Sequence, residues 1–370
     1  MGKTIITVII LAVVLAACSS GGDSIVIKKA ESVQLKQVDS VSMDGQYLMA
    51  MADTDGTYFI DALTPTGPNP DAGVIEIRNS QMDVVSTLTI RRGKGPGEVL
   101  FPAFVKLLGD EIYILDGTKR SIEIFDYQGN YKDTILLNGS FSIFKWITPL
   151  VKSDKGIAVA PVLPDLLVRF DNEGEVIGSV PSWLKDNTDG RMWQEHASRI
   201  TGDPDGNLYL SFNEDKFEIR KYDSSLNLVW AKKIVDETTP APGMTMVVIG
   251  DSKQPVGTFV HSSFFYDEGK LYMLRGIGGE IKDRMNGRQR ERYSQPINGL
   301  DSAFIDVFNA ENGDFIRRIK APFVRTDRWA EVVKIGDAFF FNISQGRGED
   351  EEEDKDTRPD NIIIKAVVEG

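Results

Sequence analysis

The feature that most constrains the fold of this chain is an internal repeat. In each copy a turn with glycine leads into a short apolar strand, usually with a central aromatic residue, as in Asp55–Ile60 and Asp205–Leu210. The glycines of the six copies are Gly56, Gly109, Gly156, Gly206, Gly269 and Gly336, at spacings of 47 to 67 residues. This period is typical of propeller blades, so the sequence predicts an all-β fold, a six-bladed β-propeller.

A second element follows the first five copies and supports the same architecture. It consists of a strand, a turn with an acidic or amide residue, and another strand, as in Ile122–Gly129 and Leu167–Gly174. Asp, Asn and Gly are common there because they accept the backbone angles of hairpins. A sheet of two or three strands cannot bury both faces alone, but six sheets around an axis cover one another. A β-sandwich is the alternative, although its strands would not repeat the same unit six times.

The ring of blades needs a closing strand, because an open ring would expose a sheet edge. The strand Asn361–Val367 lies close to the C-terminus, with no long segment after it. Glu31–Val38 alternates apolar and polar residues near the other end of the chain. We expect this N-terminal strand to join the last blade as its outer strand and so to close the ring.

The first 17 residues have the features of an export signal. Lys3 precedes the apolar run Ile5–Val14, which is far shorter than the ~20 residues of a membrane-spanning helix. Leu15–Cys18 then resembles the bacterial lipobox, which implies that Cys18 carries a lipid and anchors the protein to a membrane. We therefore expect a signal peptide over 1–17, a flexible tether over 18–24 and the propeller over 25–370. An ordinary signal peptide with a chance cysteine is the alternative.

Two segments resemble known propeller proteins. Gly109–Asp126 is similar to an NHL-type repeat, and Arg92–Glu98 resembles a segment between the first two blades of TolB-like, six-bladed propeller lipoproteins. The resemblance implies a propeller that is exported and lipid-anchored to the cell envelope, at the outer membrane and facing the periplasm or the surface. It implies no reaction, because propellers carry many functions. Gly93–Gly97 fits neither common phosphate-binding motif, so we expect a strand-connecting turn.

Composition and motifs exclude several classes of function. The net charge of −13 argues against nucleic-acid binding. Cys18 is the only cysteine, so no intramolecular disulfide can form and no thiol nucleophile remains after lipidation. The chain has no Gly-x-Ser-x-Gly motif, and its only histidines, His196 and His261, lie outside any zinc-binding pattern. We therefore expect no cofactor, with calcium as the one metal to consider.

Calcium in the central channel would make the chain a metal-dependent hydrolase or lyase. Carboxylate and amide oxygens suit this hard cation. The candidates at the channel mouth lie at or just after the repeated strands, and they are Asp61, Asp116, Asn213 and Asn342. The simpler interpretation is that these residues form turns. The acidic run Glu349–Asp354 lacks the alternation of an EF-hand and is expected to be a solvated loop.

Two insertions, Asp236–Gly257 and Gly276–Pro296, are the best candidates for a binding site, because long loops on a rigid scaffold often bind ligands. The second has five basic residues against three acidic ones. Its candidate binding residues, suited to carboxylate or sugar ligands, are Arg288, Arg290, Arg292 and Tyr293. The alternative is a loop that only balances charge. The first hypothesis is thus a non-catalytic lipoprotein that binds a protein, small molecule or carbohydrate, and the second is the metal-dependent enzyme.

Overall fold

The computed structural model describes most of the chain as β-strands and turns. The described residues are 23–28, 30–43, 47–52, 58–63, 71–108, 110–139, 150–160, 165–181, 199–213, 217–239, 244–249, 252–257, 260–277, 280–286, 289–295, 300–326, 330–344 and 361–369. Within these ranges there is no helix, and so none that could cross a membrane. The expected all-β fold is confirmed for this part of the chain.

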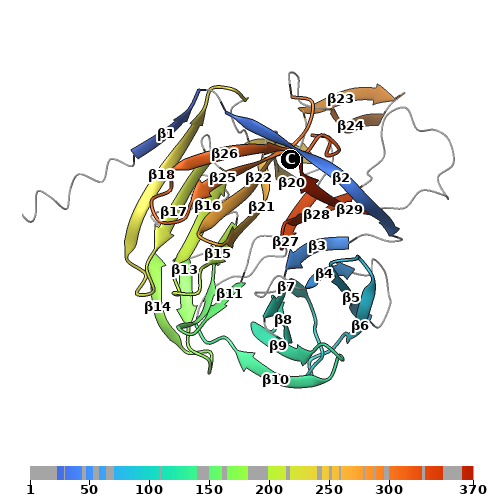
Figure 1. Ribbon diagram of the computed structural model, residues 1–370. Helices are drawn as coiled ribbons and strands as arrows, with labels where there is room; N and C mark the ends of the chain where they lie inside the picture. The colour runs from blue at the N-terminus through green and yellow to red at the C-terminus, as the bar shows by residue number, and fades with distance from the viewer. Residues whose placement is uncertain are drawn as a thin grey trace, which may run out of the picture.

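Most strands form antiparallel sheets that follow one another along the chain (Figure 1). The first sheet contains β3 (Tyr47–Ala52), β4 (Tyr58–Leu63), β5 (Asp71–Asn79) and β6 (Val84–Arg91), and the second contains β7 (Pro102–Leu108), β8 (Glu111–Asp116), β9 (Ser121–Asp126) and β10 (Tyr131–Leu136). The third contains β11 (Leu150–Ser153), β12 (Gly156–Val159), β13 (Asp165–Phe170) and β14 (Val176–Pro181), and the fourth contains β15 (Arg199–Gly202), β16 (Leu208–Asn213), β17 (Phe217–Tyr222) and β18 (Leu228–Asp236). The fifth contains β21 (Val260–Asp267), β22 (Lys270–Ile277), β25 (Phe304–Asn309) and β26 (Phe315–Lys320), and the sixth contains β27 (Ala330–Ile335), β28 (Ala338–Ser344) and β29 (Asn361–Val368). These last two are joined into one eight-stranded sheet by β2 (Ser32–Met43), which pairs with both β26 and β29.

The sheets are arranged around a centre, as in a β-propeller (Figure 1). The first strand of each sheet is innermost, and β3, β7, β11, β15, β21 and β27 contact one another in that order, with β27 returning to β3. Hydrophobic clusters fill the space between neighbouring sheets. One cluster joins Tyr113 of the second sheet to Phe170 of the third, and another joins Phe217 of the fourth to Phe308 of the fifth. Each sheet is therefore covered by its neighbours, which explains why one repeat could not be stable alone.

The repeated turns that the structure describes lie at one end of the strands, which we call the turn face. There the first strand of a sheet turns into the second, and the third into the fourth. Gly156, Gly206, Gly269 and Gly336 have positive φ angles of 56° to 100° in these turns, which explains why glycine recurs. In the turn after β9, Asp126 accepts hydrogen bonds from the backbone N–H groups of Gln128 and Asn130. The expected roles of glycine and aspartate in these turns are confirmed.

The N-terminal segment adds two strands to the outside of the sheets. β2 (Ser32–Met43) pairs antiparallel with β29 over Leu35–Met43, and its first three residues pair in parallel with β26 of the fifth sheet. The outer strand expected over Glu31–Val38 therefore starts at Ser32 and extends to Met43. β1 (Asp23–Ile27), which the sequence did not predict, pairs in parallel with β18 as a fifth strand of the fourth sheet. Asp23 and Ser24, which were expected to belong to the tether over 18–24, are part of β1.

Candidate functional site

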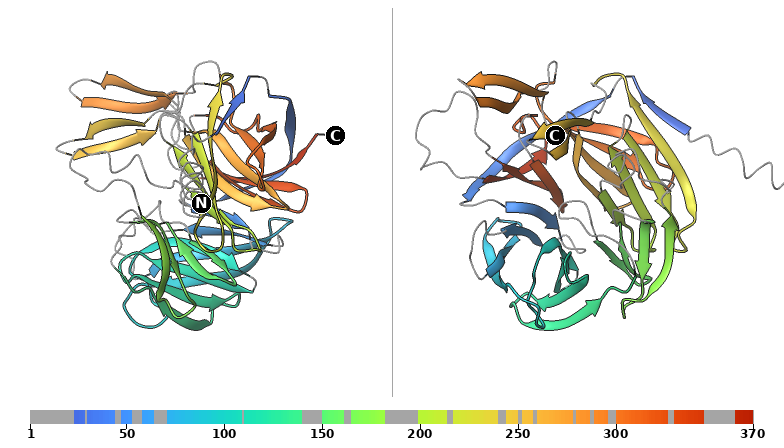
Figure 2. Two further views of the ribbon diagram at one scale, coloured as in Figure 1. Left: turned by 90° about the vertical axis from the view of Figure 1, so that its left-hand side faces the viewer. Right: turned by 180° about the vertical axis from the view of Figure 1, so that it is seen from behind.

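Both insertions leave the sheets at the end opposite the turn face, which we call the insertion face. They form two separate antiparallel hairpins, β19–β20 (Met244–Ile249 and Ser252–Gly257) and β23–β24 (Glu280–Asn286 and Gln289–Gln295). The first hairpin follows β18, and the second connects β22 to β25. Figure 2 shows both hairpins projecting from the same side of the ring. The described part of each insertion is therefore a hairpin whose two strands pair with each other, rather than the long loop expected.

The hairpin β23–β24 contains most of the predicted binding residues. In its register Arg290 is opposite Met285, Arg292 is opposite Asp283, and Tyr293 is opposite Lys282. Arg288 lies outside the described residues. Arg290 and Arg292 are thus two positions apart on one strand of a hairpin that stands out from the ring, so the structure brings these two predicted positions together in one element.

A buried cluster of two arginines and two aspartates lies where the hairpins begin. Arg275 of β22 donates through Nη1 to Asp306 Oδ2 at 2.6 Å and to Asp236 Oδ2 at 3.1 Å. Arg318 of β26 donates through Nε to Asp306 Oδ1 at 2.7 Å and through Nη2 to Asp236 Oδ2 at 2.6 Å. Their guanidinium groups also stack on aromatic rings, Arg275 on Phe217 at 4.1 Å and Arg318 on Phe304 at 3.8 Å. We call Asp236, Arg275, Asp306 and Arg318 the ionic cluster.

The electrostatics of the ionic cluster favour the charged forms of Asp236 and Arg318. Burial raises the pKa of Asp236, but hydrogen bonding from Thr238 and the charges of Arg275 and Arg318 outweigh it and lower the pKa to about 2. Burial lowers the pKa of Arg318, but its hydrogen bonds and ion pairs with Asp306 and Asp236 raise it overall. Asp236 ends β18 just before the first hairpin, and Arg275 lies near the end of β22, just before the second. The cluster therefore fixes the strand ends from which both hairpins project.

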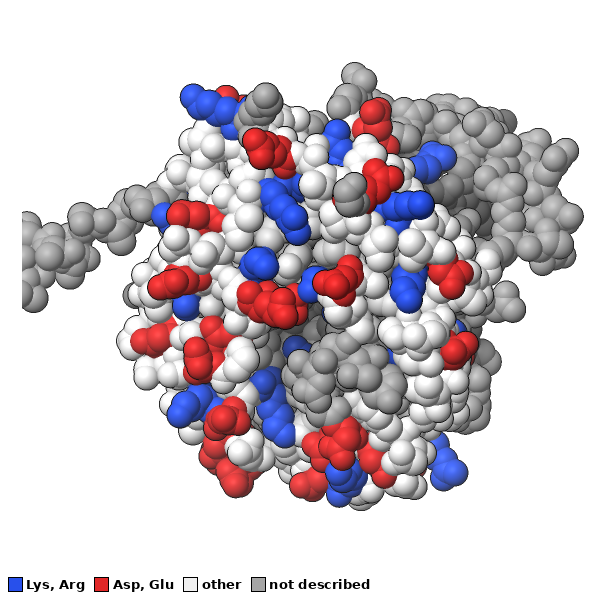
Figure 3. Space-filling model, in the orientation of Figure 1, with Lys and Arg blue, Asp and Glu red and all other residues white. Residues whose placement is uncertain are grey.

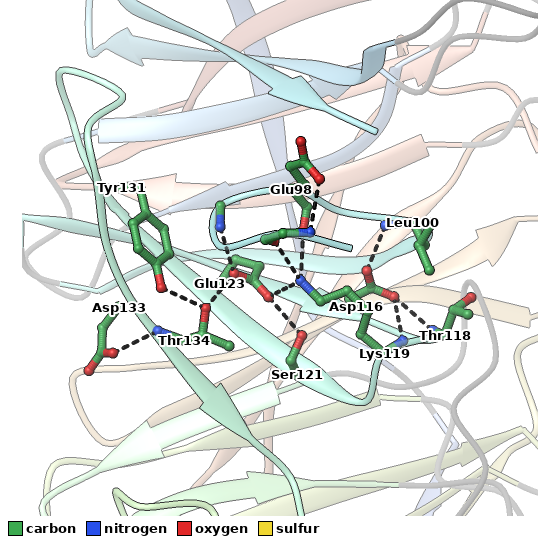
Figure 4. A network of polar contacts seen from close by, with 12 residues as sticks. Glu98, Leu100, Asp116, Thr118, Lys119, Ser121, Glu123, Tyr131, Asp133 and Thr134 are labelled. Atoms are coloured by element: carbon green, nitrogen blue, oxygen red, sulfur yellow. Dashed lines mark hydrogen bonds and ion pairs between the residues drawn. The ribbon is translucent and has the colours of Figure 1, made fainter. Parts of the chain in front are cut away.

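The segment Arg92–Glu98 is a turn fixed by a second polar network (Figure 4). Lys119 Nζ donates to Glu123 Oε1 at 2.6 Å and to the carbonyl oxygen of Glu98 at 2.9 Å. The backbone N–H of Gly95 donates to Glu98 Oε2 at 2.8 Å, and that of Gly97 donates to Glu123 Oε2 at 3.1 Å. These carboxylates occupy the N–H groups that a bound anion would need. The segment is a strand-connecting turn, as expected, and ties the first sheet to the second.

Of the four predicted channel-mouth residues, the structure describes the side chains of Asp116 and Asn342. Asp116 is fully buried, and its carboxylate accepts backbone hydrogen bonds from Leu100 (2.6 Å), Thr118 (2.8 Å) and Lys119 (2.9 Å). Asn342 is buried within β28, opposite Glu331. The structure does not describe the side chains of Asp61, Asn213 and His261. It also does not describe His196 or the acidic run Glu349–Asp354. No group of three or more His, Cys, Asp or Glu residues that could hold a metal occurs among the described residues.

The innermost strands contribute ionisable residues that the sequence analysis did not single out. Arg199 of β15 approaches Glu331 of β27, with 3.7 Å between Nη2 and Oε1, so this pair spans from the fourth sheet to the sixth. Lys106 of β7 has no ion pair with any described carboxylate, and burial lowers its pKa to about 8. A lysine inside the apolar strand Pro102–Leu108 was the signal available in the sequence. These three residues place charged groups on the innermost strands.

Comparison with known proteins identifies a shared fold and no more. No family model matches the chain, and no curated protein shows significant sequence similarity to it. A member of the DUF4221 family from Bacteroides vulgatus is similar in structure, with a TM-score of 0.53 and 11% identity over 92% of this chain and 100% of that one. A luciferin-regenerating enzyme has a TM-score of 0.46 and 11% identity, over 91% of this chain and 96% of that one. BamB from Moraxella catarrhalis has a TM-score of 0.41 and 11% identity, over 90% of this chain and 99% of that one.

Proposed function

We propose that this protein is a lipid-anchored, six-bladed β-propeller of the cell envelope that binds a partner through its insertion face. The observation that carries the proposal is that both inserted hairpins project from one side of the ring (Figure 2). Each insertion is a hairpin with its own hydrogen-bonded strand pair, and buried ion pairs fix the scaffold below. Insertions that share one face of a rigid scaffold are typical of a binding surface.

The blade count and the closure of the ring are part of this proposal. Each of the six sheets is one blade, and β2 is the outer strand of the last blade, next to β29. The pairing of Leu35–Met43 with Asn361–Val368 and the sequence of contacts among the innermost strands support this arrangement. It agrees with the resemblance to NHL-type and TolB-like propellers.

Export and anchoring rest on Cys18. The lipobox-like sequence Leu15–Cys18 supports cleavage after residue 17 and acylation of the cysteine, and we propose on this basis that the protein is attached to the cell envelope, at the outer membrane and facing the periplasm or the surface. A diacyl or triacyl group provides effectively permanent attachment, because each buried CH₂ contributes ~0.8 kcal/mol. Cys18→Ala should move the protein from the detergent phase to the aqueous phase in a phase-partitioning assay, whereas Ser19→Ala should not. Detergent partitioning of Cys18→Ala equal to wild type would show that the anchor is elsewhere.

The binding role of the insertion face is tested by crosslinking in intact cells. A photoreactive amino acid at Gln289, at the start of β24, should give a discrete adduct, whereas one at exposed Gln128 on the turn face should not. In a second experiment the photoreactive amino acid is placed in the hairpin β19–β20. Replacing residues 280–295, the hairpin β23–β24, with two glycines should then abolish the adduct. Adducts of equal yield from Gln289 and Gln128 would mean that the insertion face is not a specific binding surface. The ligand chemistry that suits Arg288, Arg290, Arg292 and Tyr293 is an acidic protein surface, a carboxylate or a carbohydrate.

A further inference from the structure

The strand β1 fixes where the membrane anchor meets the propeller. It lies at the outer edge of the fourth sheet, with Asp23 opposite Lys232 and Ile27 opposite Asp236 of β18. Because the pairing is parallel and β18 ends at the insertion face, β1 also runs toward the insertion face. Ile27 is buried in the cluster between the fourth and fifth sheets, so β1 is held by side-chain packing as well as by its ladder. Asp23 is opposite Lys232, the middle residue of β18, so β1 begins halfway along the outer edge of the fourth sheet and runs from there toward the insertion face.

The short distance in sequence between Cys18 and β1 limits how far the propeller can stand from its anchor. Asp23 follows Cys18 by five residues. An extended chain spans at most about 3.6 Å per residue, so Asp23 lies within about 18 Å of the lipidated cysteine. A domain of this length has a radius of gyration of about 20 Å, so one edge of the molecule must lie near the bilayer surface.

That edge carries exposed apolar side chains on two neighbouring sheets. Their exposed fractions are 46% for Val176, 56% for Ile177, 50% for Leu228 and 52% for Val229. The two sheets meet there, since Leu226, in the turn before β18, lies 3.1 Å from the position of a Cβ atom on Gly178 of β14. We call these four residues the apolar rim.

We propose that the apolar rim rests on the lipid bilayer and that the insertion face is turned away from it. This proposal rests on the lipidation of Cys18. Tether length and strand direction place this edge nearest to the membrane, and the exposed valine, leucine and isoleucine side chains suit the boundary between headgroups and acyl chains. Exposed Lys233 and Glu175 lie on the same two sheets, and Figure 3 shows basic and acidic side chains interspersed on the turn face. The contact is therefore apolar and insensitive to salt.

Site-specific quenching tests this orientation, and the chain is suited to it because its only native cysteine is the lipidated one. Val229→Cys and Val85→Cys would each be labelled with a fluorophore in the lipidated protein. The matched control, Val85, is 49% exposed on the outer strand of the first sheet, three sheets away around the ring. The protein is bound to vesicles of phosphatidylethanolamine and phosphatidylglycerol with nitroxide-labelled headgroups. We expect several-fold stronger quenching at position 229 than at position 85, unchanged at high salt.

The outcomes separate this proposal from the lipid attachment. A protein that does not float with the vesicles overturns the lipid attachment and this proposal with it, whereas a protein that floats but is quenched equally at both positions overturns the orientation alone. Inserting twelve Gly and Ser residues before Asp23 should bring the two signals closer together, and an unchanged ratio would overturn the role of the tether. The fluorophore at position 229 can also be followed in the Cys18→Ala protein without vesicles. If it became more shielded from solvent as the protein concentration rose, a second copy of the chain, and not the bilayer, would be the occupant of the apolar rim.

Discussion

Removing one charge from the ionic cluster should destabilise the whole protein. Asp306 is fully buried and accepts hydrogen bonds from Arg275 Nη1 at 2.6 Å, Arg318 Nε at 2.7 Å and Arg318 Nη2 at 3.0 Å. Asp306→Asn keeps the volume of the side chain but leaves two buried guanidinium groups with a single carboxylate, Asp236. Removing one partner of a buried ion pair costs about 3–5 kcal/mol. This is a large fraction of the ~5–15 kcal/mol by which a native protein is usually stable.

Urea unfolding of the Cys18→Ala protein, followed by tryptophan fluorescence, measures this loss. Trp230, which donates to the carbonyl oxygen of Glu311 at 2.8 Å, packs in the cluster between the fourth and fifth sheets and should report on it. The control is Asp314→Asn, an exposed aspartate in the turn before β26, which should change stability by less than about 0.5 kcal/mol. Adding Arg318→Met to Asp306→Asn restores charge balance and should recover part of the loss. If Asp306→Asn were as stable as Asp314→Asn, the cluster would not hold the fifth sheet in the way described.

Three further predictions concern acid, the N-terminal strands and the hairpin arginines. Because the pKa of Asp236 falls from an unfolded value of about 3.8 to about 2 in the folded protein, its ionised form adds about 2 kcal/mol of stability above about pH 5. This contribution is lost as the pH falls through 4 to 2, and Asp236→Asn should reduce the drop in urea midpoint between pH 6 and pH 3. Deleting 24–40 removes buried Ile27 and Leu35 and the ladder beside β29, so the melting temperature should fall sharply, and an unchanged value would refute the closing role of β2. Changing Arg288, Arg290 and Arg292 to Glu should weaken binding of an acidic partner strongly at low salt and less at high salt, and wild-type affinity in a titration would exclude this hairpin as its site.

The sheets were predictable because their turns leave local signals in the sequence. Glycine at 156 or 206 marks a backbone angle that other residues rarely adopt, and Asp126 marks a turn that its own carboxylate closes. The signal fails where the turn uses another residue, as at Leu226, which has a φ of 66° without being glycine. It also fails for the short first strands, such as Leu150–Ser153, which no glycine turn precedes. The number of strands in each unit was therefore underestimated.

The site was less predictable, because its contacts join residues that are far apart in the sequence. A charged residue in the apolar run of β22 marks Arg275 as unusual, but its partners come from β18 and β25 and could not be identified without the fold. The hairpin Glu280–Gln295 was interpreted as a loop because its many charged residues hide the alternation of a strand. Asp116 illustrates the opposite case, since the simpler interpretation, a turn-forming aspartate, agrees with its three backbone hydrogen bonds.

The pairing of β2 with β29 has a consequence for how the protein is made. Met43 is opposite Asn361, so these partners are more than 300 residues apart in the sequence, and contacts of such long range form slowly. Because the chain is synthesised from its N-terminus, β2 is complete long before β29 has been made. During that time the edge of β2 is open to pairing with other chains. We therefore expect folding to depend on chaperones that shield this early segment until the last strand arrives.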